Sequence, residues 1–87
     1  MHPAKLQLRG FKREELLIIL KRAEEFEKEI LQTKDGIDIF FEDVEIARSF
    51  ISKLKNDFRF ETKMSTENLG FRNGRGKYLF VYSIRKS

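Results

Sequence analysis

The sequence predicts an α+β domain with the element order β-α-β-α-β-β, a two-layer sandwich in which both helices cover one face of a four-stranded mixed sheet. Two segments, near residues 12–31 and 44–58, carry apolar side chains at helical spacing. Four shorter segments alternate apolar and polar residues or are rich in β-branched and aromatic residues, as strands are. At 87 residues the chain is expected to form one domain, over residues 4–86.

The first strand and the first helix are predicted in the N-terminal part of the chain. Ala4–Arg9 alternates apolar and polar residues, which indicates a half-buried strand, and Gly10 ends it. Lys12–Leu31 has apolar residues at positions 16, 19, 20, 23, 26 and 30, the stripe of an amphipathic helix. The glutamates on the outer surface of this helix are expected to be solvated rather than catalytic.

A turn, a central strand and the second helix are expected next. Gly36 closes the turn Lys34–Gly36 and supplies a positive φ where the turn needs one. Ile37–Phe41 is apolar on both faces, which predicts a central strand. Asp43 is a good N-cap, and the helix after it has apolar residues at positions 47, 50, 51, 54 and 58 on one side.

The C-terminal part predicts two strands, Phe58–Met64 and Lys77–Arg85, which pair as a hairpin around the connecting residues Ser65–Gly76. Each helix is expected to link roughly parallel strands through a right-handed crossover. The helices would then cover one face of the sheet and leave the other open. The sequence does not decide which face of the last strand meets the helices and which lies on the open side of the sheet.

The composition excludes several classes of protein. The chain has no Cys, so we expect no disulfide, no thiolate metal site and a reducing, cytoplasmic location. Its longest apolar run, Leu16–Leu20, is far shorter than the ~18 residues of a membrane-spanning helix, so no membrane partner is expected. Charged residues make up 37% of the chain, and with few Asn and Gln this composition is typical of heat-adapted proteins.

The net charge of +4 is unevenly distributed along the chain. Residues 1–57 hold 11 cations and 12 anions, whereas residues 58–87 hold 7 cations and 2 anions. The cationic excess therefore lies in the last third, which favours an anionic partner. The alternative is a solvated basic edge that only maintains solubility.

The stretch Gly70–Phe80 (GFRNGRGKYLF) places three cations among glycines ahead of a β-type run. Asn73-Gly74 is a strong signal for a two-residue hairpin turn, so the glycines there serve the backbone conformation. A turn does not require Arg72, Arg75 and Lys77, which would add positive charge around an RNA phosphate. The stretch is neither a Walker loop nor a KH-type G-x-x-G loop. It is interpreted as a hairpin tip, with RNA contact as the second interpretation.

The open sheet face is the second candidate surface, because aromatic rings flanked by cations form a stacking platform for single-stranded RNA. Arg59, Lys63 and Phe40 are expected on this face. The last strand would add one of two sets, either Tyr78, Phe80 and Tyr82 or Leu79 and Val81. The alternative is that these side chains belong to the core or pack against a neighbouring domain.

The sequence does not predict an enzyme. General acid–base and nucleophilic chemistry need convergent groups, and the only His is His2, close to the terminus. Asp38 is the one carboxylate on a central strand, and it has no evident catalytic partner; we expect it to accept a hydrogen bond from a turn or an Arg. No metal-ligand spacing is present, so no metal and no cofactor are expected.

Several segments together resemble the middle segment of the NMD-three family. The similarity covers about residues 4–86, and its most specific parts are Asp35-Gly36-Ile37-Asp38 and Tyr82-Ser83-Ile84-Arg85. The other matching segments are Leu6-Gln7-Leu8-Arg9, the helix positions Ala47, Phe50 and Leu54, Lys63-Met64-Ser65, Leu69-Gly70 and Tyr78.

The resemblance implies a role on the large ribosomal subunit, in maturation or export, by binding rather than by catalysis. In an organism without a nucleus that role would be assembly or quality control. Members of the family carry paired CxxC zinc motifs before this segment and further domains after it. This chain has no Cys, so zinc binding does not carry over. Asp38 and Arg85 carry over as structural signatures.

These observations lead to one prediction and one alternative. The prediction is a non-catalytic RNA- or ribosome-binding module related to large-subunit assembly adaptors, a monomer or weak dimer with ribosomal RNA, the large subunit or another protein domain as partner. The alternative is a protein-interaction or packing module with no affinity for nucleic acid. The residues expected to bind RNA are Arg59, Lys63, Arg72, Arg75, Lys77 and Arg85.

Overall fold

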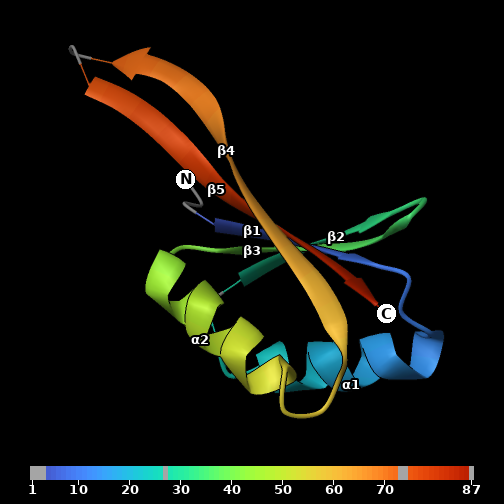
Figure 1. Ribbon diagram of the computed structural model, residues 1–87. Helices are drawn as coiled ribbons and strands as arrows, with labels where there is room; N and C mark the ends of the chain where they lie inside the picture. The colour runs from blue at the N-terminus through green and yellow to red at the C-terminus, as the bar shows by residue number, and fades with distance from the viewer. Residues whose placement is uncertain (1–3, 27, 73–74, 87) are drawn as a thin grey trace.

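The structure, a computed structural model, describes residues 4–26, 28–72 and 75–86 (Figure 1). It has two helices and one five-stranded mixed sheet, which confirms the α+β class and corrects the expected four strands to five. The elements are β1 (Ala4–Arg9), α1 (Arg13–Ala23), β2 (Lys28–Thr33), β3 (Gly36–Phe41), α2 (Val44–Leu54), β4 (Phe60–Arg72) and β5 (Arg75–Lys86).

The strands lie in the order β2-β3-β1-β5-β4. Only β1 and β5 pair in parallel, and the other three neighbouring pairs are antiparallel. Both helices lie on the same face of the sheet, as expected (Figure 1). The prediction that the first helix links Ala4–Arg9 to a parallel Ile37–Phe41 is wrong, because these two strands pair antiparallel. The helix instead connects β1 to β2, which runs parallel to β1 with β3 between them.

The additional strand, β2, comes from a segment that was expected to be the end of the first helix. The helix stops at Ala23, and a turn follows in which the backbone N–H of Phe26 donates to the Ala23 carbonyl at 3.1 Å. β2 then pairs with β3 through the expected turn after Thr33, whose hydroxyl donates to the Gly36 carbonyl at 3.0 Å. Ile30 fits both the helical stripe and a strand, so the pairing with β3 decides its conformation.

At the start of each helix, the capping residue forms a hydrogen bond with a residue of the first turn. The carboxylate of Asp43 accepts from the backbone N–H of Glu45 at 2.8 Å, which confirms the predicted N-cap of α2. The backbone N–H of Lys12 donates to Glu15 at 2.9 Å at the start of α1. The carboxylate of Glu15 also accepts a hydrogen bond from Lys86, which ties the end of β5 to α1.

Glu15 has a lowered pKa for a direct structural reason. The hydrogen bond from the Lys86 ammonium, followed by the one from the Lys12 backbone, holds the pKa of Glu15 below its ordinary value of 4.5. Lys86 itself lies 6.0 Å from the ring centroid of Phe11 and 5.9 Å from that of Phe58. The last residues of β5 are therefore held by charge and by aromatic contact together.

This pairing predicts a pH-dependent contribution to stability. A carboxylate whose pKa is lower in the folded state than in the unfolded state stabilises the fold at pH values above its unfolded-state pKa. This stabilisation is lost as the pH falls through its folded-state pKa. The difference in the free energy of unfolding between the wild type and Glu15→Gln should therefore shrink as the pH is lowered from 7 to about 3, when measured by urea denaturation. A difference that stays constant over this range would contradict the assignment.

The core lies between the helices and the inner face of the three central strands. Phe41 and Phe50 are at its centre with ring centroids 5.6 Å apart, and the Phe26 ring lies 6.3 Å from the first and 6.0 Å from the second. The remaining buried apolar residues of this core are Ala4, Leu6, Leu8, Ile19, Ala23, Ile39, Ala47, Ile51, Leu54, Tyr82 and Ile84.

The register of β5 settles which of its faces meets the helices. Tyr82 lies opposite Leu6 and Ile84 opposite Leu8, so these two side chains belong to the inner face. Since side chains alternate along a strand, Leu79 and Val81 belong to the outer face. This outer face of the sheet carries no helix (Figure 1) and is called the open face from here on.

The long strands β4 and β5 extend beyond the rest of the sheet. β1 pairs with β5 only from Phe80 to Arg85, so residues 67–72 and 75–79 pair only with each other. They form a two-stranded arm that projects away from the helices (Figure 1). The expectation that Ser65–Gly76 is a loop is therefore wrong for most of its length, because cross-strand pairing continues to the pair Arg72–Arg75. The expected Asn73-Gly74 turn lies outside the described residues.

Candidate nucleic-acid interface

The open face presents a mixture of charged, polar and apolar side chains. The pairing register of the five strands places the following residues on it: Lys5, Gln7, Arg9, Glu29, Leu31, Asp38, Phe40, Glu61, Lys63, Ser65, Glu67, Leu79, Val81, Ser83 and Arg85. Among the side chains that the structure describes on this face, the cations are Lys5, Arg9, Lys63 and Arg85 and the carboxylates are Glu29, Asp38, Glu61 and Glu67. The two signs are balanced in this part of the face, so it alone does not attract a polyanion strongly.

Half of the cations on the open face have a carboxylate partner. Lys5 Nζ lies 3.9 Å from Glu67 Oε1, and Arg9 Nη2 lies 2.9 Å from Asp38 Oδ1. Lys63 and Arg85 take part in no ion pair with the part of the chain that the structure describes, and both are exposed. Among the described cations of this face, Lys63 and Arg85 are therefore the two available to an anionic ligand.

Asp38 is buried on the open face, with 5% of its surface exposed. Arg9 neutralises it and at the same time donates from Nη1 to the Leu8 carbonyl at 3.0 Å. Asp38 Oδ1 lies within ion-pair distance of Arg9 but accepts no well-aligned hydrogen bond, so charge rather than geometry holds this contact. Asp38 therefore has an Arg as its partner, as expected, but the contact is an ion pair and the expected hydrogen bond to Oδ1 is not formed.

Within the described part of the sheet that β1 and β3 share with β5, the expected aromatic platform is reduced to the Phe40 ring. Tyr82 and Phe80 lie on the inner face, whereas Phe40 lies on the open face with the ammonium of Lys5 at 5.8 Å from its ring centroid. Leu79 and Val81 share the face with Phe40, as one of the two expected sets, but both are buried. Successive bases would therefore find a single aromatic surface here instead of a row of them.

The six residues expected to bind RNA fall into separate groups. Lys63 and Arg85 are on the open face, and the exposed Arg59 directly precedes β4. The backbone places Arg72, Arg75 and Lys77 at the far end of the arm, where Arg72 lies opposite Arg75 and Lys77 opposite Gly70. At about 3.3 Å per strand residue, the two ends of β4 are roughly 40 Å apart.

A groove between α2 and β4, called the α2–β4 groove below, was not predicted from the sequence. It has a volume of about 250 Å³ and is lined by Arg48, Ile51, Ser52, Lys55, Thr62 and Tyr82. Three of these, Arg48, Ser52 and Lys55, lie at positions i, i+4 and i+7 and so share one side of the helix. That spacing was available in the sequence, but the position of Tyr82 beneath it depends on the register of β5.

Arg48 is held in place within the α2–β4 groove. Its Nε donates to the hydroxyl of Tyr82 at 2.9 Å, and its Nη1 lies 3.5 Å from Glu45 Oε1. The hydrogen bond to Tyr82 raises the pKa of Arg48 above its ordinary value, so the guanidinium is charged at any physiological pH. The Nε side of the guanidinium is thereby fixed, while the side chain as a whole is 53% exposed and lines the groove.

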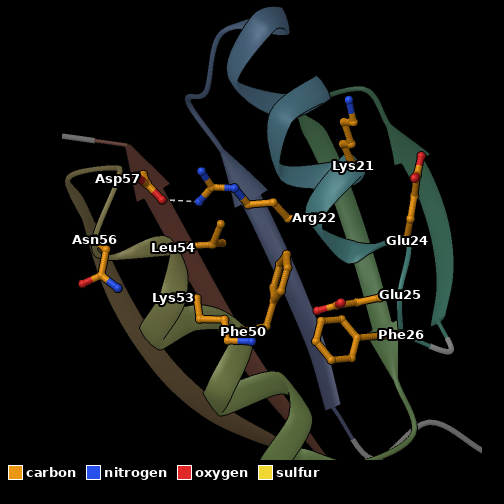
Figure 2. A pocket seen from close by; sticks show the side chains of 10 residues that line it. All are labelled: Lys21, Arg22, Glu24, Glu25, Phe26, Phe50, Lys53, Leu54, Asn56 and Asp57. Atoms are coloured by element: carbon orange, nitrogen blue, oxygen red, sulfur yellow. Dashed lines mark hydrogen bonds and ion pairs between the residues drawn. The ribbon is translucent and has the colours of Figure 1, made fainter.

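A second hollow lies between the C-terminal ends of the two helices and has a volume of about 530 Å³. Figure 2 shows the Phe26 and Phe50 rings at its base and the ion pair between Arg22 and Asp57 across its rim. Lys53 lies over the Phe26 ring at 5.8 Å from the centroid. The lining contains three cations and three carboxylates, so the hollow has no field of one sign; they are Lys21, Arg22, Lys53, Glu24, Glu25 and Asp57.

A third hollow, of about 500 Å³, is apolar. It lies between α1 and the β2 side of the sheet, and it is lined mainly by Leu16, Leu17, Leu20 and Ile37, with Arg13 and Gln32 at its edges. Leu17 is 60% exposed. A surface of this kind is more typical of contact with another protein than of contact with a nucleic acid.

In the part of the chain that the structure describes, no three His, Asp or Glu side chains gather where they could hold a metal ion. None of its helices is long and apolar enough to cross a membrane. His2 lies outside the described residues.

Sequence comparison assigns the chain to a known family. The family model described as NMD3, second domain, matches residues 4–85, which is nearly the whole chain. The match confirms the resemblance that the segments around Asp38 and Arg85 predicted. No curated protein matches the chain.

Proposed function

Because the chain belongs to the NMD3 family, we propose that it is a non-catalytic module that binds ribosomal RNA on the large ribosomal subunit. The family is one of ribosome-related assembly adaptors, which act by binding. We further propose that the domain works in the cytoplasm, in keeping with a sequence that has no Cys.

The arm formed by β4 and β5 is the observation that carries this proposal. It projects beyond the sheet (Figure 1), and the chain places Arg72, Arg75 and Lys77 at its far end. A two-stranded arm of this length reaches a phosphate backbone that the body of the domain does not touch. Two-stranded ribbons contact DNA in other proteins, and with RNA as with DNA, cations that neutralise phosphates supply the sequence-independent part of the affinity.

Removing the cations of the arm should weaken RNA binding and flatten its dependence on salt. Each phosphate contact contributes a slope of roughly −0.7 to −0.9 in a plot of log K against log salt concentration. We expect the triple variant Arg72→Gln, Arg75→Gln, Lys77→Gln to lose about 2 units of slope against large-subunit RNA in filter-binding titrations.

A matched control distinguishes position from net charge. The triple variant Arg13→Gln, Lys21→Gln, Lys34→Gln removes the same charge from exposed residues that have no ion pair with the described part of the chain. It should retain nearly the wild-type slope. Equal losses in the two triple variants would show that only the overall charge matters and would rule out the arm as the contact.

A second candidate function is docking to another protein, favoured by the apolar hollow beside α1. β2 is an edge strand of the sheet, and its Ile30 and Leu31 are 47% and 53% exposed. An edge strand next to exposed apolar residues pairs readily with another chain. Self-association in analytical ultracentrifugation that Leu31→Lys abolishes, together with no RNA affinity at low salt, would favour this function over the first.

A further inference from the structure

The α2–β4 groove exists because β4 is an edge strand that the helices do not cover. α2 packs on β1 and β3, and the inner face of β4 beside it is exposed at Thr62 and Met64. Tyr82 and Ile51 form the floor of the resulting trough. The groove is thus bounded by regular elements on both sides, which fixes the separation of its walls.

The groove walls carry hydrogen-bond donors that suit an oxyanion. Arg48 of α2 and Lys55, which caps its C-terminal end, supply two cations to the lining, and Ser52 of α2 and Thr62 of β4 supply two hydroxyls. Arg48 is oriented by its bond to Tyr82, so a guanidinium edge is presented without loss of rotamer freedom on binding. A tetrahedral phosphate group accepts hydrogen bonds from all three of these donor types.

One carboxylate competes for this site, and it competes weakly. Glu45 is the carboxylate that the described contacts bring to Arg48, at 3.5 Å. The Glu45 side chain is 79% exposed and that of Arg48 is 53% exposed. An ion pair so open to solvent contributes little, so a phosphate with better geometry can replace it.

We propose that the α2–β4 groove binds a backbone phosphate of the RNA, with Arg48 and Lys55 as the charged contacts and Ser52 and Thr62 as neutral donors. This inference rests on the proposed function and adds a second RNA contact to that of the arm. The groove flanks the first residues of β4 and the arm cations flank its last ones. The two contacts are roughly 30 Å apart along the strand, so one RNA must span that length to reach both.

The charged contacts are tested with two lysines that lie two positions apart on the same helix. Lys55→Gln removes a cation from the groove, whereas Lys53→Gln removes one from the rim of the hollow in Figure 2. Lys55→Gln should reduce the salt slope of RNA binding by about 0.7–1 unit, and Arg48→Gln with Lys55→Gln by roughly twice that. Lys53→Gln should leave the slope unchanged.

The orientation of Arg48 is tested without any change of charge. Tyr82→Phe removes the hydroxyl that accepts from Arg48 Nε and retains the buried ring. We expect RNA affinity to fall several-fold with the unfolding transition little changed. Affinity equal to the wild type would show that Tyr82 does not position Arg48 for a ligand.

Two further probes separate failure of this inference from failure of the proposed function. Inorganic phosphate alone should shift the backbone amide resonances of Ser52, Lys55 and Thr62 in the wild type and not in the Arg48→Gln, Lys55→Gln variant. Normal RNA binding with a slope that these variants do not change would overturn the groove and leave the arm proposal intact. Amide shifts with phosphate but no RNA binding would overturn the proposed function and leave an anion site.

A competitor of a different class tests the assignment to RNA. Polyglutamate is a flexible polyanion whose charges are carboxylates instead of tetrahedral phosphates. RNA should bind the groove more tightly than polyglutamate at equal ionic strength. Equal affinities, lost together in the Arg48→Gln, Lys55→Gln variant, would overturn RNA as the ligand and indicate an acidic protein segment.

Discussion

Replacing Phe41 with alanine is expected to destabilise the domain by about 3–5 kcal/mol, as for other fully buried aromatic residues. Its side chain has no exposed surface and contacts both Phe26 and Phe50, so its removal leaves a cavity at the centre of the core. A domain of this size has roughly 5–15 kcal/mol of stability, so a large part of it would be lost. Urea denaturation followed by circular dichroism measures the change.

The neighbouring phenylalanine provides the control for this prediction. Phe40 lies on the same strand but on the open face, where it is only partly buried. Phe40→Ala should therefore destabilise the domain clearly less than Phe41→Ala. An equal or larger effect at Phe40 would show that the open face is covered and would contradict the two-layer description.

Replacing Gly36 with alanine is expected to destabilise the domain by about 1–3 kcal/mol, since added atoms here meet backbone. An alanine Cβ would lie 2.0 Å from the Leu8 carbonyl oxygen, on the strand that pairs with β3. A backbone atom cannot move aside as a flexible side chain does, so β1 and β3 would have to separate at this point. The free energy of unfolding and the amide exchange of Leu8 and Arg9 report this change.

Asp35 serves as the matched position in the same turn. It is exposed and directly precedes Gly36, and Asp35→Ala should change stability by no more than about 0.5 kcal/mol. A Gly36→Ala variant as stable as Asp35→Ala would show that the two strands are not held as closely as described.

The elements with one consistent local signal were predictable from the sequence. β1 alternates cleanly, β3 is apolar on both faces, and Asp43 marks the start of α2. The turn at residues 34–36 was also predicted. Each of these assignments rests on residues that are close in the chain, so no long-range contact was needed to make them.

The elements that were missed depend on contacts that sequence spacing does not reveal. Ile30 continues the helical stripe of α1, and only its pairing opposite Ile39 makes it part of a strand. The turn signal at Lys34–Gly36 has apolar residues on both sides, which is the pattern of a β-hairpin. The prediction of a long first helix ignores this pattern. The alternation of apolar and polar residues predicts strands only as far as Met64 and from Lys77, with Ser65–Gly76 as the connection, whereas the pairing continues to Arg72 and Arg75.

The same holds for the candidate site: the sequence shows which residues are present, but not which of them lie close together in the fold. Residues 58–87 do carry a cationic excess, but β4 is 13 residues long and its two ends lie in opposite parts of the molecule. The cations at these ends therefore do not form one patch. The open face, expected to be a basic platform, has carboxylates in equal number. The α2–β4 groove joins α2 to residues of β4 and β5, and no single segment of sequence contains it.

The proposal that this domain binds the large ribosomal subunit through phosphate contacts is tested most directly by co-sedimentation. The domain is mixed with purified large subunits and run on sucrose gradients at low and at high salt. We predict that it migrates with the subunit at low salt, is released at high salt, and is released at lower salt when Arg72, Arg75 and Lys77 are replaced by Gln. A domain that stays at the top of the gradient at low salt would contradict the proposal.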